Sequence, residues 1–204
     1  MKPCWIFCGA PSKEFNIYPP QNSYVIAADG GYSLVKKLGI KPDLILGDFD
    51  SLSENIPDDC QVIKAPAEKD DTDTMLAVKK ALSMGFDDIT LASSIGGRLD
   101  HTYANIQTLA YIIDNNAKCC MVGEHDIVYL LNKGEYIFNK IINMYFSIFS
   151  YGKSAIVSTT GTKYNLTEYF LTDKFPLGVS NEIIEQNCNL SVKEGQILVI
   201  FSKK

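Results

Sequence analysis

The chain has 204 residues, of which 46% are hydrophobic, so it can bury a full core in one or two domains. Its formal net charge is −5, and its Lys and Arg residues are scattered rather than gathered in a basic stripe, which argues against nucleic acid as a partner. The first residues hold only a short apolar run, too short for a signal-peptide core or a membrane span, so we expect a soluble protein with no membrane partner.

The first part of the chain, residues 1–123, alternates short β-rich apolar runs with helix-like stretches. Two helices are expected at 73–84 and at 100–114, because apolar residues recur there near the helical period. This rhythm is typical of an α/β domain, in which a parallel sheet is covered by helices. The expected strands are 5–7, 24–28, 44–46, 61–63, 89–92 and 118–122.

The second part, residues 124–204, has strand-like segments separated by Asn, Gly and Lys turns, with no strong helix between them. It predicts a smaller antiparallel β domain. The expected strands are 127–131, 136–138, 145–149, 155–158 and 197–201. Gly152-Lys153-Ser154 resembles the end of a P-loop, but Ser147 stands where that motif needs Gly, so we expect only a hairpin turn there.

Cysteine and histidine usage narrows the chemistry of any metal site. The six cysteines contain no CxxC pair, and an intracellular chain would keep them as thiols. Only His101 and His125 are present, so a structural zinc site is not expected. Any metal would be bound by oxygen.

Carboxylates gather where the predicted strands end. Asp29 follows the second strand, Asp48 and Asp50 follow the third, Asp70-Asp71-Thr72-Asp73 precedes a helix, and Asp100 follows the fifth strand. A single Asp here is often only a turn former or a helix cap. Several together repel one another unless a cation neutralises them, and carboxylates with phosphates are typical ligands of Mg²⁺. We therefore expect a magnesium site at this edge of the sheet.

Two glycine pairs, Gly30-Gly31 and Gly96-Gly97, accompany these carboxylates. Glycine lets the backbone approach a ligand and offer N–H groups to phosphate oxygens, although a pair can also mark an ordinary turn. Arg98 follows the second pair and adds a fixed cationic fork. The sequence therefore indicates a phosphate-binding site without a P-loop or a GxGxxG motif.

These motifs, in this order, resemble the thiamine pyrophosphokinase family. The resemblance rests on Ala28-Asp29-Gly30-Gly31, Gly47-Asp48-Phe49-Asp50-Ser51, Lys69-Asp70-Asp71-Thr72-Asp73, Gly96-Gly97-Arg98-Leu99-Asp100-His101, the stretch 158–166 and Gly178-Val179-Ser180-Asn181-Glu182. It implies a cytoplasmic homodimer with a Rossmann-like domain at 1–123 and a β-sandwich domain at 124–204 for thiamine binding and dimerisation. The implied reaction is Mg²⁺-dependent transfer of the pyrophosphoryl group of ATP to thiamine, which releases AMP.

The resemblance also implies roles for individual residues. The metal ligands fall on Asp48, Asp50, Asp70 and Asp73, and the catalytic residues on Asp73, Arg98 and Asp100. Either Asp73 or Asp100 could accept the proton of the thiamine hydroxyl, and His101 is either catalytic or only holds its loop. Tyr164 stands where many members have Trp. The substrate-binding positions are Asp29, Gly30, Gly31, Asp70, Thr72, Arg98, His101, Tyr164, Ser180 and Asn181.

Two other functions use the same residues. A Mg²⁺-dependent phosphohydrolase would transfer the phosphoryl group to water, and a nucleotide sensor would bind Mg²⁺ and ATP without turnover. Tyr164 and Ser180-Asn181 in a separate β domain favour the transferase, because hydrolysis does not need a second substrate pocket.

Overall fold

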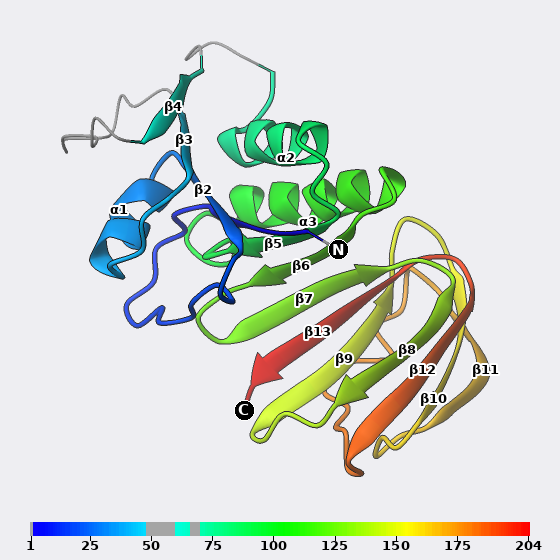
Figure 1. Ribbon diagram of the computed structural model, residues 1–204. Coiled ribbons are helices and arrows are strands. Elements are labelled where there is room, and N and C mark those ends of the chain that lie inside the picture. Colours follow the sequence, from blue (N-terminus) through cyan, green and yellow to red (C-terminus); the bar gives the residue numbers. More distant parts are fainter. Residues whose placement is uncertain (1, 48–59, 66–69) are drawn as a thin grey trace. The chain divides into compact units, whose positions relative to one another are not determined.

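The computed structural model describes residues 2–47, 60–65 and 70–204 (Figure 1). Its chain divides into two compact units, Met1–Glu124 and His125–Lys204. Asp48 and Asp50, two of the predicted metal ligands, lie outside the described residues. None of the helices in the described ranges is long and apolar enough to cross a membrane.

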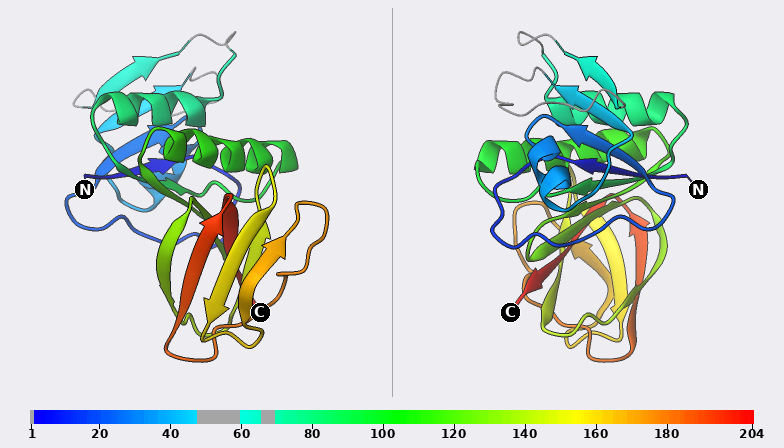
Figure 2. Two further views of the ribbon diagram at one scale, coloured as in Figure 1. Left: turned by 90° about the vertical axis from the view of Figure 1, so that its right-hand side faces the viewer. Right: turned by 60° about the vertical axis from the view of Figure 1, so that its left-hand side comes forward.

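The first unit is built on parallel strands in the spatial order β4-β3-β2-β1-β5-β6. The helices are α1 (Gly31–Lys37), α2 (Asp73–Ser83) and α3 (Leu99–Asp114), with α2 packed beside α3 and α1 on the other face of the sheet (Figures 1 and 2). The strands are β1 (Pro3–Phe7), β2 (Tyr24–Ala28), β3 (Leu44–Gly47), β4 (Gln61–Lys64), β5 (Asp88–Ala92) and β6 (Lys118–Val122).

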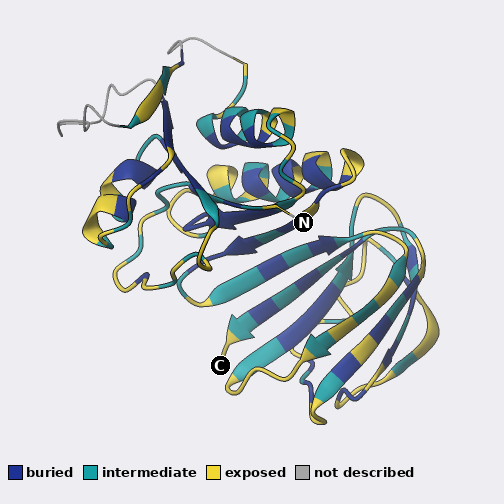
Figure 3. Cartoon of the chain, viewed as in Figure 1, coloured by how far each residue is buried: buried dark blue, intermediate teal, exposed yellow. Residues whose placement is uncertain are grey.

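Helices on both faces explain why the inner strands read as continuous apolar runs. Every residue of β3 is buried, and so are the last four residues of β2 and of β5 (Figure 3). β4 at the edge is mostly exposed. The expected α/β architecture, all of its strands and the helices at α2 and α3 are therefore confirmed.

In the second unit, which the structure describes throughout, all of the paired strands are antiparallel to one another. Two groups of paired strands run in the orders β7-β13-β9 and β11-β10-β12-β8. The strands are β7 (Asp126–Leu131), β8 (Gly134–Asn139), β9 (Met144–Ser150), β10 (Ala155–Thr160), β11 (Leu166–Leu171), β12 (Asn187–Glu194) and β13 (Ile197–Lys203).

One apolar core joins the two groups of strands in the second unit. Phe146 and Phe201 from one group and Val157 and Leu190 from the other belong to the same buried cluster. Burial alternates along β10, β12 and β13, as expected when one face of a sheet packs and the other meets water (Figure 3). The mixed α/β fold with a separate antiparallel unit agrees with the prediction.

The sequence missed three elements and misjudged one turn. α1 has only seven residues, and β11 has four exposed residues in succession, so neither shows a clear period. β12 does alternate, but its polar residues hid the pattern. The predicted hairpin at Gly152 is wrong, because β9 pairs with β13 whereas β10 pairs with β11 and β12. The turn connects two different sheets.

Candidate functional site

The strand order of the first unit creates a natural ligand site beside β1. The chain goes from β1 through β2 to β3 in one direction, whereas β5 pairs with the opposite side of β1. Connections therefore run from the carboxyl ends of β1 and β5 in opposite directions and leave a crevice between them, where ligands bind in open parallel sheets.

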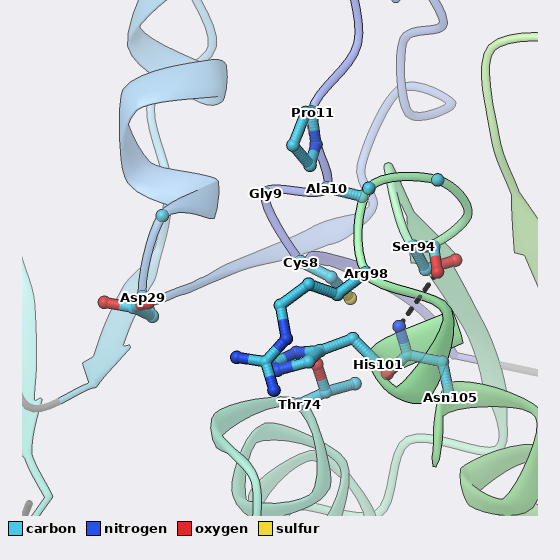
Figure 4. Close-up of a pocket in the computed structure, with 13 residues that line it drawn as sticks. Cys8, Gly9, Ala10, Pro11, Asp29, Thr74, Ser94, Arg98, His101 and Asn105 are labelled. Atoms are coloured by element: carbon cyan, nitrogen blue, oxygen red, sulfur yellow. Dashed lines mark hydrogen bonds between the residues drawn. The ribbon is translucent and has the colours of Figure 1, made fainter. Parts of the chain in front are cut away.

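A pocket of about 370 Å³ lies at this position (Figure 4). The segments after β1, β2 and β5, the first turn of α2 and the first two turns of α3 line it. Arg98 and His101 point into it, with Asp29 on the opposite side. Its lining residues are Cys8, Gly9, Ala10, Pro11, Asp29, Gly30, Thr74, Ser94, Gly96, Gly97, Arg98, His101 and Asn105.

Paired contacts hold the segment after β1 against the segment after β5. The Ala10 N–H donates to the Ser93 carbonyl at 2.8 Å, and the Ser93 hydroxyl donates to the Ala10 carbonyl at 2.9 Å. Gly97 has a φ of +66°, and a Cβ on it would lie 2.7 Å from the ring of Pro11. Glycine is therefore needed here for both its conformation and its small size.

Arg98 and Asp100 form an ion pair with two hydrogen bonds at the N-terminus of α3. Arg98 Nε donates to Asp100 Oδ1 at 3.1 Å, and Nη2 donates to Oδ2 at 2.5 Å. The His101 N–H also donates to Asp100 Oδ1. Hydrogen bonding to Arg98 lowers the pKa of the Asp100 carboxyl, and the same bond raises the pKa of Arg98. Both side chains remain exposed, so this carboxylate orients the guanidinium at the surface of the pocket.

The two residues of the first predicted glycine pair have different surroundings. Gly30 lines the pocket, whereas Gly31 is buried against β1. Asp29, in a left-handed conformation that Asp tolerates, and Gly30 line the pocket. Gly31 is buried at the start of α1, where a Cβ would lie 1.9 Å from the Phe7 carbonyl oxygen. Gly31 is therefore required because the backbone of β1 packs against it, and not because a ligand does.

The residues of the acidic stretch 70–73, at the start of α2, make different contacts. The Thr72 hydroxyl caps the helix by accepting from the Met75 N–H at 3.1 Å, and Asp71 pairs with Lys79 at 2.6 Å. Asp73 is the first residue of α2 and Asp70 is exposed just before it. Neither lines the pocket, but Thr74, the next residue, does.

The described carboxylates among the predicted metal ligands offer the type of ligand atom that Mg²⁺ prefers, but they are too few to form a complete binding site. Asp70 and Asp73 supply the oxygen donors that Mg²⁺ prefers. Within residues 2–47, 60–65 and 70–204, no three His, Cys, Asp or Glu side chains are arranged to hold a metal. The other two predicted ligands, Asp48 and Asp50, fall outside these ranges.

The predicted thiamine-side residues come together in the second unit. The buried Asn181 amide brackets the backbone of Tyr164: Oδ1 accepts from the Tyr164 N–H at 3.1 Å, and Nδ2 donates to the Tyr164 carbonyl at 2.9 Å. Asn181 Oδ1 also accepts from the Glu182 N–H. The amide thus positions Tyr164, a residue that is 63% exposed.

Ser180 has an unusual backbone. Its φ is +57°, and its N–H donates to the Ser147 hydroxyl at 2.9 Å. A left-handed non-glycine residue costs conformational energy and is common at functional sites. Ser180 thereby directly precedes Asn181, whose side chain bonds to the Tyr164 backbone.

Sequence reasoning missed several pocket residues, chiefly Thr74, Ser94 and Asn105. Thr74 directly follows a predicted carboxylate, and Asn105 is one turn after His101 on the same side of α3, so helical spacing was a usable signal. Cys8 also lines the pocket. Burial raises the pKa of its thiol to about 12, so it is not a thiolate nucleophile at neutral pH.

A parallel α/β unit whose glycine loops, arginine and Asp29 carboxylate line one pocket beside the ends of β1 and β5 has the form of a nucleotide-binding phosphotransferase. The family model for the thiamin pyrophosphokinase catalytic domain matches residues 15–121, and the model for its vitamin B1 binding domain matches residues 132–197. The chain belongs to the thiamine pyrophosphokinase family.

Individual relatives resemble the chain along its whole length. The thiamine pyrophosphokinase of Bacillus subtilis (strain 168) is 31% identical over 214 residues, which cover 99% of each chain. A crystal structure of thiamine pyrophosphokinase from Bacillus subtilis superimposes with a TM-score of 0.92, at 28% identity and with 100% of both chains covered. The thiamin pyrophosphokinase structure from Geobacillus thermodenitrificans gives 0.86, at 26% identity, covering 98% of this chain and 97% of that one.

Proposed function

We propose that this chain is a thiamine pyrophosphokinase that transfers the pyrophosphoryl group of ATP to the hydroxyl of thiamine and releases AMP. The observation that carries the proposal is the pocket at the ends of β1 and β5, where Arg98 stands beside two glycine loops within the segment that matches the family's catalytic domain. The vitamin B1 binding model over the second unit supports thiamine as the acceptor.

In this reaction the thiamine hydroxyl oxygen forms a bond to the β-phosphorus of ATP. The bond from that phosphorus to the oxygen between the α- and β-phosphates breaks, and AMP leaves with the oxygen. The hydroxyl proton passes to a base. Charge that develops on the phosphoryl oxygens is stabilised by the Arg98 guanidinium, which Asp100 holds in place, and by the N–H group of Gly97, because the Gly96 N–H already donates to Thr102 Oγ1.

Asp73 is the better candidate for the base. Both Asp100 oxygens accept from Arg98, and the lowered pKa of this carboxyl makes it a weak proton acceptor. Asp73 stands at the start of α2, next to the pocket residue Thr74. We assign Asp100 the role of positioning Arg98, and His101 a place beside it in the pocket.

We further propose Mg²⁺ as the cofactor, held by Asp48, Asp50, Asp70 and Asp73. When bound, it supplies charge neutralisation for the phosphate oxygens of ATP. The carboxylate donors of Asp70 and Asp73 at the start of α2 are of the right type. Asp29, Gly30 and the Gly96-Gly97 backbone would contact the nucleotide, with Gly31 and Thr72 supporting the same loops.

We assign nucleotide binding and catalysis to a Rossmann-like unit at 1–123, and thiamine binding to a β-sandwich at 124–204. The shared core of the two antiparallel groups supports the sandwich description. The exposed Tyr164 ring is the group that would pack on thiamine, with Ser180 and Asn181 shaping its surroundings.

We also propose a homodimer that completes the thiamine site between subunits, and exposed apolar side chains of the second unit support this proposal. Large apolar side chains are exposed in its 164–184 stretch, and a second copy would cover them. These residues are Tyr164, Tyr169, Phe170, Phe175, Leu177, Val179 and Ile184. We also propose a cytoplasmic location, in keeping with six free cysteines.

Measurement of AMP and inorganic phosphate from ATP, with and without thiamine, tests the proposal. A thiamine pyrophosphokinase forms AMP and thiamine pyrophosphate in equal amounts, and only when thiamine is present. Release of inorganic phosphate at the same rate with and without thiamine would establish a phosphohydrolase instead. Tight ATP binding with no product of either kind would establish a nucleotide sensor.

A further inference from the structure

α3 carries a buried amide that the proposed reaction does not use. Asn105 is only 7% exposed, and it lines the pocket one helical turn after His101. A buried amide has two kinds of polar group, and each needs a partner. The partners of its two ends differ.

The nitrogen of this amide is anchored to the protein. Asn105 Nδ2 donates to the Ser94 carbonyl at 2.9 Å, across the loop after β5 (Figure 4). A carbonyl can only accept, so the amide must turn its NH₂ group toward Ser94, and its orientation is determined. The amide oxygen then faces away from Ser94.

The amide oxygen has no hydrogen-bond donor in the part of the chain that the structure describes. The neighbouring hydroxyls are committed elsewhere: Ser94 Oγ donates to the Leu91 carbonyl at 2.7 Å, and Thr102 Oγ1 bonds to the Gly96 loop. Among the described residues, the buried side-chain atoms that lack a partner belong to Ser23 and Ser150, so the Asn105 oxygen is open to the pocket that Asn105 lines. A ligand that displaces water from this oxygen loses affinity unless it supplies a hydrogen-bond donor in its place.

We propose that Asn105 is a specificity-determining residue whose oxygen accepts a hydrogen bond from the nucleoside part of ATP. This inference rests on the proposed function, in which ATP occupies the pocket. Ionised phosphates have no proton to donate and would be repelled by a carbonyl oxygen. The donor is therefore an O–H of the ribose or the exocyclic N–H of the base, and the phosphates lie toward Arg98.

Analogues that each lack one donor test this assignment. Binding of ATP, 2′-deoxyATP, 3′-deoxyATP and inosine triphosphate to the wild-type protein is measured by calorimetric titration without thiamine, and kcat/KM is measured with thiamine. We expect one analogue to be disfavoured about tenfold, and the identity of that analogue distinguishes ribose from base. Asn105→Ala should bind ATP and that analogue almost equally.

Thr108→Val is the matched control. Thr108 is buried in the same helix and donates to the Ala104 carbonyl at 2.9 Å, but it does not line the pocket. This variant also loses one buried side-chain hydrogen bond and should keep the wild-type preference among the four nucleotides. Asn105→Ser is a second variant if Asn105→Ala does not fold.

The outcomes separate this inference from the proposed function. If the wild type makes no AMP from ATP and thiamine, the proposed function fails, and the binding preference still tests Asn105. The Asn105 inference is overturned if the wild type binds all four nucleotides equally. It is also overturned if Asn105→Ala keeps the wild-type preference, or if only the KM for thiamine changes.

Discussion

In both units, residues proposed to bind substrate are held by other groups of the chain before any ligand arrives. Asp100 uses both of its oxygens on Arg98, and Asn181 uses both ends of its amide on the Tyr164 backbone. Pre-organised groups of this kind lose little freedom when they engage substrate. In the proposed reaction, these partners present Arg98 and Tyr164 to the substrates.

Replacement of Arg98 tests its contact with the phosphates. Lys keeps the charge but cannot reproduce the two-point bond to Asp100 or to phosphoryl oxygens. We expect Arg98→Lys to lower kcat by at least about tenfold, which corresponds to about 1.4 kcal/mol of barrier, with a smaller change in the KM for thiamine. Steady-state kinetics with both substrates varied measures this. Unchanged kcat and KM would reduce Arg98 to a loop-holding residue.

The Arg98–Asp100 pair also predicts a pH dependence of stability. The pKa of Asp100 is lowered in the folded state, so its ionised form favours folding above the unfolded pKa of about 3.9 and this contribution is lost as pH falls through the folded pKa. The unfolding midpoint of Asp100→Asn should lie slightly below that of the wild type at pH 7. The two should converge in strong acid, and a constant difference would contradict this assignment.

At the scale of elements, close backbone approach determines which glycines are required. α1 begins at Gly31 against the carbonyl oxygen of Phe7 at the end of β1, and this contact places the Asp29 turn beside the pocket. Gly30, one residue earlier, has open space, because a Cβ there would lie 3.9 Å from the Gly9 carbonyl oxygen and would meet nothing closer.

The two glycines therefore predict opposite outcomes. Gly31→Ala must push α1 away from β1 and should lower the unfolding midpoint clearly, with a cost of about 1–3 kcal/mol for overpacking. Gly30→Ala should leave stability within about 0.5 kcal/mol, because its φ of −55° suits any residue. Thermal unfolding of both variants compares them. Equal midpoints would show that α1 adapts without strain.

At the scale of the whole molecule, the proposed reaction needs groups from both units. The first unit holds Asp73 and Arg98, and the second holds Tyr164 among exposed apolar side chains. Residues in separate units can serve one reaction either within a chain or between two chains of a dimer.

Complementation between inactive variants distinguishes these arrangements. Asp73→Asn and Tyr164→Ala should each lose most activity as pure proteins. If the thiamine site is shared between subunits, unfolding and refolding them together should restore about a quarter of wild-type activity, because half of the dimers are mixed and each has one intact site. Light scattering confirms that dimers have formed. Mixed dimers without activity would show that each chain serves its own site.

Local patterns in the sequence were sufficient to determine the order of elements. Continuous apolar runs predicted every strand of the first unit, and the helical period predicted α2 and α3, because burial on one or both faces sets these patterns residue by residue. The short α1 and the exposed β11 escaped, since neither buries a regular face. The ordered Asp, Gly and Arg motifs were likewise enough to indicate the family.

Tertiary structure alone decided which of those residues meet. The pairing of β5 with β1, far apart in sequence, puts Arg98 and Asn105 beside Cys8 in one pocket, and no local pattern encodes that pairing. Packing also separated Gly30, which lines the pocket, from Gly31, which touches Phe7, although the two are chemically identical. Long-range contact determines a side chain's surroundings, and those surroundings determine whether a polar group such as the Asn105 amide is left to bind a ligand.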